Sequence, residues 1–532
     1  MTPLATVARA ARRSASGAAA GASAWAFAMA ATASDVPPAP SSLSSSSATT
    51  IKPAPAMPDT PLAECHVAGI RNGVLCGLLQ RPLDPAHPER AQIAIRYVVV
   101  PAMARRKLPD PVFLLAGGPG QSAVAVAAPT MALFGRLNNR RDIVFVDQRG
   151  TGGSAPLQCE EPEHETLAEQ ADPERQVRLA MQCKAHLLKL PYVRSEDDLR
   201  YFTTSIAVQD LDAVRRALAA ERIDLVGASY GTRVALEYQR QFPNAVRRSV
   251  IDGVAPPDLA MPASFSRDNQ AALDALFAAC AAEPACALDH PELRAHFEAL
   301  LASLPRTAKA ADPLTGRSEE FILGRDMLLG AVRNALYAPQ IAAALPEAID
   351  AAQRGDIAGI VGLHATFSAR KSTRIAEGMH LSVVCAEDVP RVRESADEPG
   401  ADFGAAFARF YGRMCADWPR GDVPAAFYSI AASATPVLVL SGGLDPATPP
   451  RHGERVARAL GPMARHVVVA NAGHGVLGIG CMRDVVYRFI DAAADSDALV
   501  VDTGCAAKVP RPPAFRPIGS EGAGATSSWV AR

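Results

Sequence analysis

One serine of this sequence lies in a pattern that can turn a hydroxyl group into a nucleophile. Residues 227–231 read Gly-Ala-Ser-Tyr-Gly, and they stand between a run of buried-type residues and a helix-like segment. Glycines are needed around such a tight turn, because side chains there would clash with neighbouring backbone. The pattern alone is common, so its position between a strand and a helix carries the prediction that Ser229 is a nucleophile.

A serine hydroxyl is a poor nucleophile until a base takes its proton, and that base needs an acid that holds its tautomer. Asp445 follows the predicted strand 436–440, and His474 follows the predicted strand 467–469. Taken singly, such an Asp is usually a turn or cap residue and such a His is usually structural. Because the two would lie at the same sheet edge as Ser229, in the chain order Ser, Asp, His, we predict that the three form a catalytic triad.

The tetrahedral intermediates of acyl transfer need two backbone N–H donors for their oxyanion, each contributing on the order of 3 kcal/mol. Tyr230, next to the predicted nucleophile, is expected to supply one. The second is expected from Gly118 in residues 117–120, Gly-Gly-Pro-Gly, which follow the predicted strand 112–115. A phosphate-binding loop is the alternative, but this segment lacks the Lys and Ser/Thr of such loops, and its proline has no N–H.

These motifs resemble the proline iminopeptidase and tripeptidyl aminopeptidase family of serine exopeptidases, which have the α/β-hydrolase fold. Residues 147–152, Asp-Gln-Arg-Gly-Thr-Gly, are the most specific of them, whereas esterases and lipases share the serine motif. Ala116 stands where proline iminopeptidases usually carry His, so the chain is more similar to the secreted tripeptidyl branch. The segments that carry the likeness span most of the chain: residues 117–120, 147–152, 227–231, 441–446 and 448–450.

An aminopeptidase needs a carboxylate that pairs with the α-ammonium group of its substrate. The resemblance implies acids near Glu387 and Asp388, so we predict that these two residues bind the substrate amino terminus. A solvated acidic turn is the alternative for them. Asp147 and Arg149 are expected to form a buried structural ion pair rather than to act in catalysis.

The elements that must position these residues follow an α/β pattern. Runs of Val, Ile and Leu alternate with helical segments, which predicts a mostly parallel sheet flanked by helices, an α/β-hydrolase core at residues 62–256 and 434–510. Residues 257–433 break this alternation and predict an inserted helical cap over the active site. The predicted strands are 93–100, 112–115, 143–146, 223–226, 249–251, 436–440 and 467–469, and predicted cap helices include 269–282 and 327–336.

The amino-terminal segment is typical of an exported protein. Arginines precede an Ala-rich apolar run that ends in Ala-Thr-Ala, so residues 1–33 predict a signal peptide, with a membrane anchor as the alternative and the export route open. Residues 34–61 are rich in Ser and Pro and predict a flexible linker. Residues 511–532 predict a loose tail. We expect the mature chain to be periplasmic or extracellular, without stable membrane insertion.

All ten cysteines lie beyond the predicted cleavage point, and an even number in an exported chain favours disulfides. A zinc site is the competing interpretation, but the sequence has no Cys-x-x-Cys pair and no His cluster with ligand spacing. Sequence alone leaves the connectivity open. Bonds between neighbours along the chain would pair Cys65 with Cys76, Cys159 with Cys183, Cys280 with Cys286, Cys385 with Cys415, and Cys481 with Cys505.

The 54 basic and 55 acidic residues balance, so no net charge favours nucleic acid or an anionic membrane as a partner. Peptides are the expected substrates, and neither a metal nor an organic cofactor is implied. The combined pattern predicts a secreted serine peptidase that releases residues or short peptides from the amino terminus through an acyl-enzyme. An esterase or thioesterase on the same fold and a catalytically silent binding protein are the alternatives. The cleavage preference, the number of residues released and the oligomeric state are left open.

Overall fold

The structure, a computed structural model, describes residues 60–160, 162, 164–368 and 375–516. The predicted signal peptide at residues 1–33, nearly all of the predicted linker and most of the predicted tail therefore lie outside the described residues. The first strand begins at Thr60, inside the end of the predicted linker. In the part of the chain that the structure describes, no helix has the length and apolar character needed to cross a membrane.

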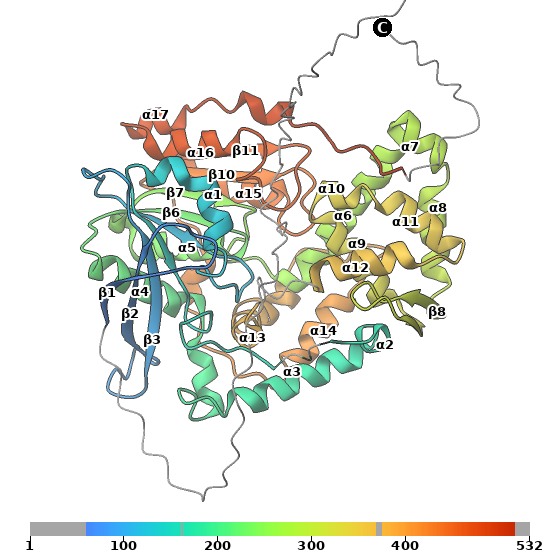
Figure 1. Ribbon diagram of the computed structural model, residues 1–532, viewed down its shortest axis with the longest axis horizontal. Helices are drawn as coiled ribbons and strands as arrows, with labels where there is room; N and C mark the ends of the chain where they lie inside the picture. The colour runs from blue at the N-terminus through green and yellow to red at the C-terminus, as the bar shows by residue number, and fades with distance from the viewer. Residues whose placement is uncertain (1–59, 161, 163, 369–374, 517–532) are drawn as a thin grey trace, which may run out of the picture.

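A nine-stranded sheet runs through the core in the order β1-β2-β3-β5-β4-β6-β7-β10-β11 (Figure 1). Its first three strands and the β3–β5 pair are antiparallel, and every other pair is parallel. All seven predicted strands are present, whereas β1 and β2 were not predicted. The strands are β1 Thr60–Cys65, β2 Val74–Pro82, β3 Gln92–Val100, β4 Val112–Leu115, β5 Ile143–Val146, β6 Ile223–Ala228, β7 Val246–Asp252, β10 Val437–Gly442 and β11 Ala464–Val469.

Helices cover both faces of this sheet. In β10, Val437 and Val439 pack into one hydrophobic cluster and Leu438 and Leu440 into another, because successive side chains of a strand point to opposite faces. The first cluster includes residues of α4 Thr204–Ala217, α5 Tyr230–Gln241 and α15 Pro450–Leu460. The second includes residues of α1 Ala127–Asn138, α16 Met482–Asp491 and α17 Asp495–Leu499.

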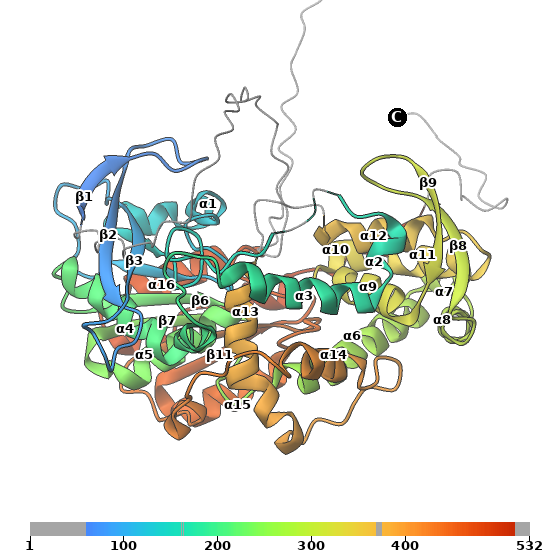
Figure 2. The same ribbon diagram turned by 90° about the horizontal axis from the view of Figure 1, so that it is seen from below.

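The chain between β7 and β10 forms a mainly helical body beside the carboxyl edge of the parallel strands, which we call the cap (Figures 1 and 2). It has its own hydrophobic cluster. It also contains a hairpin, β8 Arg306–Ala311 and β9 Ser318–Leu323, that the sequence did not predict. Its α-helices are α6 Met261–Ala282, α7 Pro284–Asp289, α8 Leu293–Ala302, α9 Arg325–Leu336, α10 Pro339–Ala342, α11 Leu345–Gln353, α12 Ala358–Ser368, α13 Glu377–Val383 and α14 Ala406–Met414.

A second stretch of the chain reaches the cap from the core. Helices α2 Leu167–Gln170 and α3 Pro173–Leu187 lie between β5 and β6 in the sequence. Nevertheless α2 contacts β9, and α3 contacts α13 and α14 (Figure 2). The cap side is therefore built from two separate segments.

Five disulfides close short loops within the described chain, and they leave no free cysteine there. Each joins neighbours along the sequence, so the predicted pairing is confirmed. The bonds are Cys65–Cys76, Cys159–Cys183, Cys280–Cys286, Cys385–Cys415 and Cys481–Cys505.

Candidate active site

Ser229 occupies the sharp turn between β6 and α5. Its backbone has φ 55° and ψ −123°, a conformation that residues with side chains rarely adopt. A Cβ at Gly227 would lie 2.3 Å from the carbonyl oxygen of Gly231, so only glycine fits there. A Cβ at Gly231 would lie 2.1 Å from the carbonyl oxygen of Leu115. The turn therefore holds Ser229 at the carboxyl end of β6, as the motif predicts.

His474 and Asp445 lie on the loops after β11 and β10, and their side chains contact each other. Oδ2 of Asp445 accepts hydrogen bonds from Nδ1 of His474 at 2.9 Å and from Oγ1 of Thr448 at 2.8 Å. Oδ1 of Asp445 accepts the backbone N–H groups of Ala447 and Thr448. With Nδ1 donating, Nε2 is the ring nitrogen of His474 that can take up a proton.

This contact shifts both pKa values. Burial alone would lower the pKa of His474, but the charge and hydrogen bond of Asp445 outweigh burial and raise it above its ordinary value. Burial alone would raise the pKa of Asp445, but His474 and the two backbone donors hold it below its ordinary value. The pair therefore stabilises a protonated imidazole next to an ionised carboxylate. This suits a general base, which becomes an imidazolium during acyl transfer.

Asp252, the last residue of β7, connects the serine turn with the histidine loop. Its backbone carbonyl accepts the N–H of Ser229 at 2.9 Å. Its carboxylate accepts the N–H groups of Val476 and Leu477, at 2.8 and 2.9 Å. Burial raises the pKa of Asp252 to about 6 despite these two donors. Sequence reasoning missed this residue, although an acid directly after a buried strand was the available signal.

Ser229 and His474 lie on turns that Asp252 holds together, but the structure records no hydrogen bond between the Ser229 hydroxyl and the His474 ring, both described residues. Gly253 packs against that ring, because a Cβ at Gly253 would lie 3.3 Å from Cε1 of His474. Hydrogen bonds between catalytic groups often tighten only when substrate is bound. The structure thus joins His474 to Asp445 directly, and the link to Ser229 stays a prediction.

The Gly-Gly-Pro-Gly segment follows β4 and runs beside the serine turn. A Cβ at Gly117 would lie 3.2 Å from Cβ of Ser229, so the backbone of the segment contacts the turn that carries Ser229. Gly118 has φ 112°, in the region that favours glycine. Tyr230 is the first residue of α5. Both predicted oxyanion donors therefore belong to segments that contact or adjoin Ser229, and their role stays a prediction.

The cap fixes this segment through a histidine. Nδ1 of His380 donates to the carbonyl oxygen of Pro119 at 3.1 Å, and Nε2 of His380 accepts the hydroxyl of Tyr411 at 2.8 Å. Burial lowers the pKa of His380, so the ring stays neutral and can both donate and accept. A residue of α13 thus holds the loop that carries the predicted oxyanion donor.

Glu387 and Asp388 end the π-helical turn Val384–Asp388, and each is only 1% exposed, so the alternative of a solvated acidic turn is wrong. Arg233 of α5 donates to Asp388 at 3.0 and 2.9 Å and to Glu387 at 3.2 Å. Glu387 also accepts the backbone N–H and the hydroxyl of Thr204. Burial raises the pKa of Glu387 to about 7, against the effect of Arg233. Both carboxylates therefore already have hydrogen-bond partners inside the protein. The prediction that they bind the substrate amino terminus did not take these partners into account.

Asp147 and Arg149 do not pair with each other, so the predicted ion pair is wrong in its partners. Arg149 is fully buried and binds Asp210 of α4 through two hydrogen bonds, at 2.7 and 2.9 Å. Asp147 accepts the hydroxyl of Ser122 at 2.6 Å and the backbone N–H of Val124 at 3.1 Å. The turn after β5 directs the two side chains to different neighbours. Asp147 binds the loop at residues 122–124, and Arg149 binds α4.

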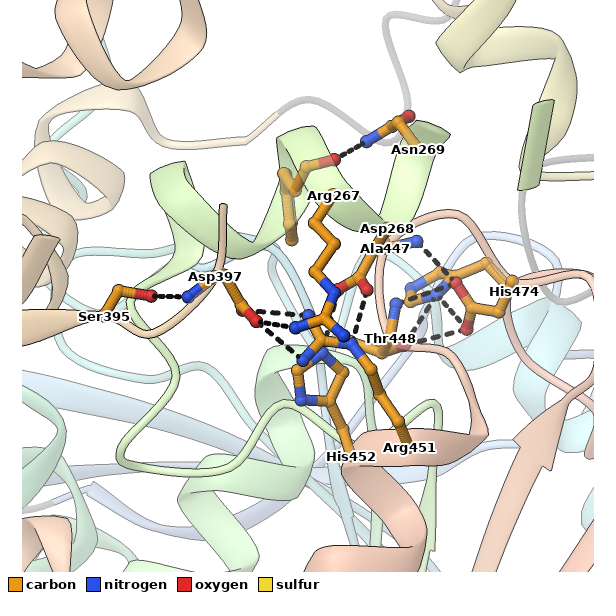
Figure 3. A network of polar contacts seen from close by, with 12 residues as sticks. Arg267, Asp268, Asn269, Ser395, Asp397, Ala447, Thr448, Arg451, His452 and His474 are labelled. Carbon is orange, nitrogen blue, oxygen red and sulfur yellow. Dashed lines mark hydrogen bonds and ion pairs between the residues drawn. The ribbon is translucent and has the colours of Figure 1, made fainter. Parts of the chain in front are cut away.

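An ion-pair network fastens the cap to the core near the Asp445 loop (Figure 3). Arg451, at the start of α15, donates to Asp268 of α6 at 2.7 Å. It also donates to both oxygens of Asp397, at 3.0 and 2.9 Å. His452 contacts Asp268 at 2.8 Å. Since α15 begins shortly after Asp445, the network holds the carboxyl end of the loop that carries this acid.

One group of potential metal ligands lies among residues that sequence reasoning did not connect. His164, Asp312 and Glu319 each place one ligand atom within 4.8 Å of the others. His164 is far from Asp312 and Glu319 in the chain, so their spacing gave no signal. Cys159 and Cys183 belong to a second such group, but their disulfide prevents them from binding a metal.

Comparisons with known proteins agree with this geometry. The model of the TAP-like protein family matches residues 401–498. The chain is 26% identical over 427 residues to serine protease Hip1 of Mycobacterium tuberculosis, a match that covers 74% of this chain and 80% of that protein. It is 26% identical over 455 residues to tripeptidyl aminopeptidase of Streptomyces lividans, with 78% and 81% covered. It is 29% identical over 421 residues to carboxylesterase B of Mycobacterium tuberculosis, with 73% and 78% covered.

The parallel sheet with helices on both faces, the serine turn after β6 and these relatives lead to one identification. The chain is a serine hydrolase of the α/β-hydrolase fold that resembles the tripeptidyl aminopeptidases.

Proposed function

We propose that this protein is an exported serine peptidase that removes residues or short peptides from the amino terminus of peptide substrates. The observation that carries the proposal is the hydrogen bond between His474 and Asp445, on loops next to the Ser229 turn. Similarity to a serine protease and to a tripeptidyl aminopeptidase supports peptidase activity. Cleavage from the amino terminus and export are finer statements and are our inference.

In the proposed reaction, Oγ of Ser229 attacks the carbonyl carbon of the scissile amide while Nε2 of His474 takes the serine proton. Asp445 holds the Nδ1–H tautomer and stabilises the imidazolium that forms. The backbone N–H groups of Tyr230 and Gly118 donate to the oxyanion. The imidazolium then gives its proton to the leaving amine, and an acyl-enzyme remains. Water, activated by the same imidazole, hydrolyses the acyl-enzyme and regenerates the free serine.

An esterase is the second candidate, because one relative is named carboxylesterase B. The triad does not discriminate between amides and esters, so the fold alone does not decide between them. The substrate must be tested directly.

A labelling experiment and a set of three substrates test the proposal. A fluorophosphonate probe should label the wild-type enzyme and should not label the Ser229→Ala variant. The wild type should hydrolyse a tripeptidyl amide with a free amino terminus faster than its acetylated form, and faster than a simple ester of similar size.

Each other outcome identifies a different function. Absence of labelling would indicate a catalytically silent binding protein. Hydrolysis of the ester alone would indicate an esterase. Equal rates on the free and acetylated peptides would indicate that the enzyme does not require an amino terminus.

Disulfides support the proposed location outside the cytoplasm, because such bonds persist mainly in oxidising compartments. Expression of the full chain in a bacterial host, followed by fractionation, tests this. The exported protein should begin at Ser34, and full-length chain retained in the cytoplasm would contradict the proposal.

A further inference from the structure

A cavity of about 260 Å³ lies inside the cap. Helices α6, α9, α12 and α14 and the α2–α3 segment line it. Phe265, Phe407 and Phe410 form much of its apolar wall, and the rings of Phe265 and Phe407 stack with centroids 5.8 Å apart. Such a mainly apolar cavity with a few polar groups is typical of a ligand-binding site.

Helix α9 leads from this cavity to the candidate active site. Asp326 and Arg333 line the cavity, and Tyr337, one turn after Arg333, packs edge-on against His474 with ring centroids 5.1 Å apart. Asp326, Arg333 and Tyr337, the residue that caps the end of α9, are spaced by seven and four positions, so they lie on one face of the helix. At 1.5 Å per residue, Tyr337 lies roughly 16 Å along the helix axis from Asp326.

Two polar atoms of the cavity lining have no partner among the described residues. Asn269 is only 2% exposed, and its Oδ1 accepts no hydrogen bond, although its amide nitrogen donates to the carbonyl oxygen of Phe265. Nδ1 of His364 is also without a partner. Burial and the nearby charge of Arg333 lower the pKa of His364 to about 4, so this ring is neutral at pH 7. Unpartnered buried polar atoms cost on the order of 1–3 kcal/mol each, so they indicate a ligand that carries hydrogen-bonding groups.

The lining also carries one unpaired charge of each sign. Asp326 is exposed at the start of α9 and has no ion-pair partner within the described chain. Arg333 lies over the ring of Phe407, 5.3 Å from its centroid, and no described carboxylate pairs with it. Glu387 and Asp388, in contrast, are already paired with a guanidinium group of α5. Asp326 is therefore the acid that is free to bind an incoming ammonium group.

We propose that the amino-terminal part of a peptide substrate lies in this cavity along α9. Its α-ammonium group pairs with Asp326, a backbone carbonyl accepts from Arg333, and an apolar side chain packs among Phe265, Phe407 and Phe410. This assignment rests on the proposed peptidase function. It names the substrate class as unblocked oligopeptides with an apolar residue near the amino terminus.

The length of α9 limits how many residues this site accepts. An extended peptide spans about 3.3–3.6 Å per residue, so roughly 16 Å corresponds to between four and five residues. A single aminoacyl group would not reach Asp326 from the nucleophile.

The Asp326→Asn variant of the full chain tests the assignment. For a tripeptidyl or tetrapeptidyl amide with a free amino terminus, KM should rise by about tenfold, as expected for loss of one ion pair in a partly enclosed site. The acetylated peptide and a single-residue amide should be hydrolysed as by the wild type, because neither places an ammonium group at residue 326. Asp326→Glu should restore a low KM for the free peptide.

Asp497→Asn is the matched control, because it removes an equal charge from an exposed residue of α17, outside the cavity. It should leave all these values unchanged. If Asp326→Asn leaves the ratio of KM values for free and acetylated peptides unchanged, the assignment is wrong. If Glu387→Gln alone reduces the preference for a free amino terminus, the ammonium group binds at the paired acids instead.

The same experiment separates this assignment from the proposed function. If the enzyme hydrolyses simple esters but no peptide amide, both the proposed peptidase function and the assignment are wrong. If the enzyme is an active peptidase whose KM values do not change with substitution of residue 326, only the assignment is wrong.

Discussion

A single carboxylate oxygen organises the candidate catalytic residues. Oδ2 of Asp445 accepts from both His474 and Thr448, and the hydroxyl of Thr448 lies 3.1 Å from Nδ1 of His474. Asp445 is completely buried, so water does not compete for this oxygen. The tautomer of the histidine is therefore determined by contacts inside the protein.

The raised pKa of His474 predicts the pH dependence of catalysis. Only the neutral imidazole can take the serine proton, so kcat/KM should fall on the acid side with an apparent pKa above 6.5. In Asp445→Asn the supporting charge is lost while burial remains, so this midpoint should move below 6.5, and kcat should fall by roughly 10³–10⁴-fold. Initial rates between pH 5 and 9 measure both effects. A midpoint that does not move in the variant would show that Asp445 does not act on His474.

The catalytic candidates were predictable from sequence because each follows a recognisable strand end. Ser229 has a local motif, and Asp445 and His474 stand in Gly-containing loops after buried runs. Thr448 and Asp252 were not predicted as parts of the site. Their roles depend on contacts with residues distant in the chain, such as the bond from the N–H of Val476 to Asp252, and no local pattern encodes such a contact.

At the scale of helices and strands, the contact between α6 and α15 is one of those that fasten the cap to the core. Asp268 is only 2% exposed and accepts from both Arg451 and His452 (Figure 3). Breaking a buried ion pair leaves an uncompensated charge. The contact between α6 and α15 should therefore be sensitive to the loss of Asp268.

Asp268→Asn should lower the free energy of unfolding by about 3 kcal/mol and should also lower kcat, because the network adjoins the Asp445 loop. Chemical denaturation and steady-state kinetics measure the two effects. Asp274→Asn is the control on the same helix: Asp274 pairs with Arg294 at the surface, so its loss should cost less than about 1 kcal/mol. Equal losses of unfolding free energy in the two variants would refute a special role for the buried Asp268 contacts.

The sequence predicted some elements and missed others for physical reasons. The parallel strands β4, β5 and β10 are buried at every residue, so they appear as continuous apolar runs. Strand β8, Arg-Thr-Ala-Lys-Ala-Ala, alternates small and charged residues and buries little, and β2 contains Gly and Gln among its apolar residues. These strands lack the composition that distinguishes a core strand from a helix or loop.

At the scale of the whole molecule, local disulfides reinforce a cap that is assembled from two parts of the chain. The fold class was predictable from composition and periodicity. The contribution of α2 and α3 to the cap side was not, because only tertiary packing against β9, α13 and α14 reveals it.

We expect the Cys385–Cys415 bond to contribute measurably to the thermal stability of the protein. It closes a 30-residue separation around the turn that contains Glu387 and Asp388, whereas Cys280–Cys286 closes a separation of 6. The chain-entropy model gives the longer loop about 1.4 kcal/mol more stabilisation. The double variant Cys385→Ser/Cys415→Ser should therefore have a lower Tm than Cys280→Ser/Cys286→Ser in thermal unfolding. The reverse order would show that loop closure does not govern the contribution of these bonds.

The backbone of the cap takes part in shaping the histidine loop. The carbonyl oxygen of Tyr337 accepts the N–H of His474 at 2.9 Å, and a Cβ at Gly473 would lie 2.3 Å from that oxygen. The cap and the loop of the predicted general base are consequently not structurally independent. Truncation of the cap in an engineered variant would therefore also remove a backbone support of His474, the predicted general base.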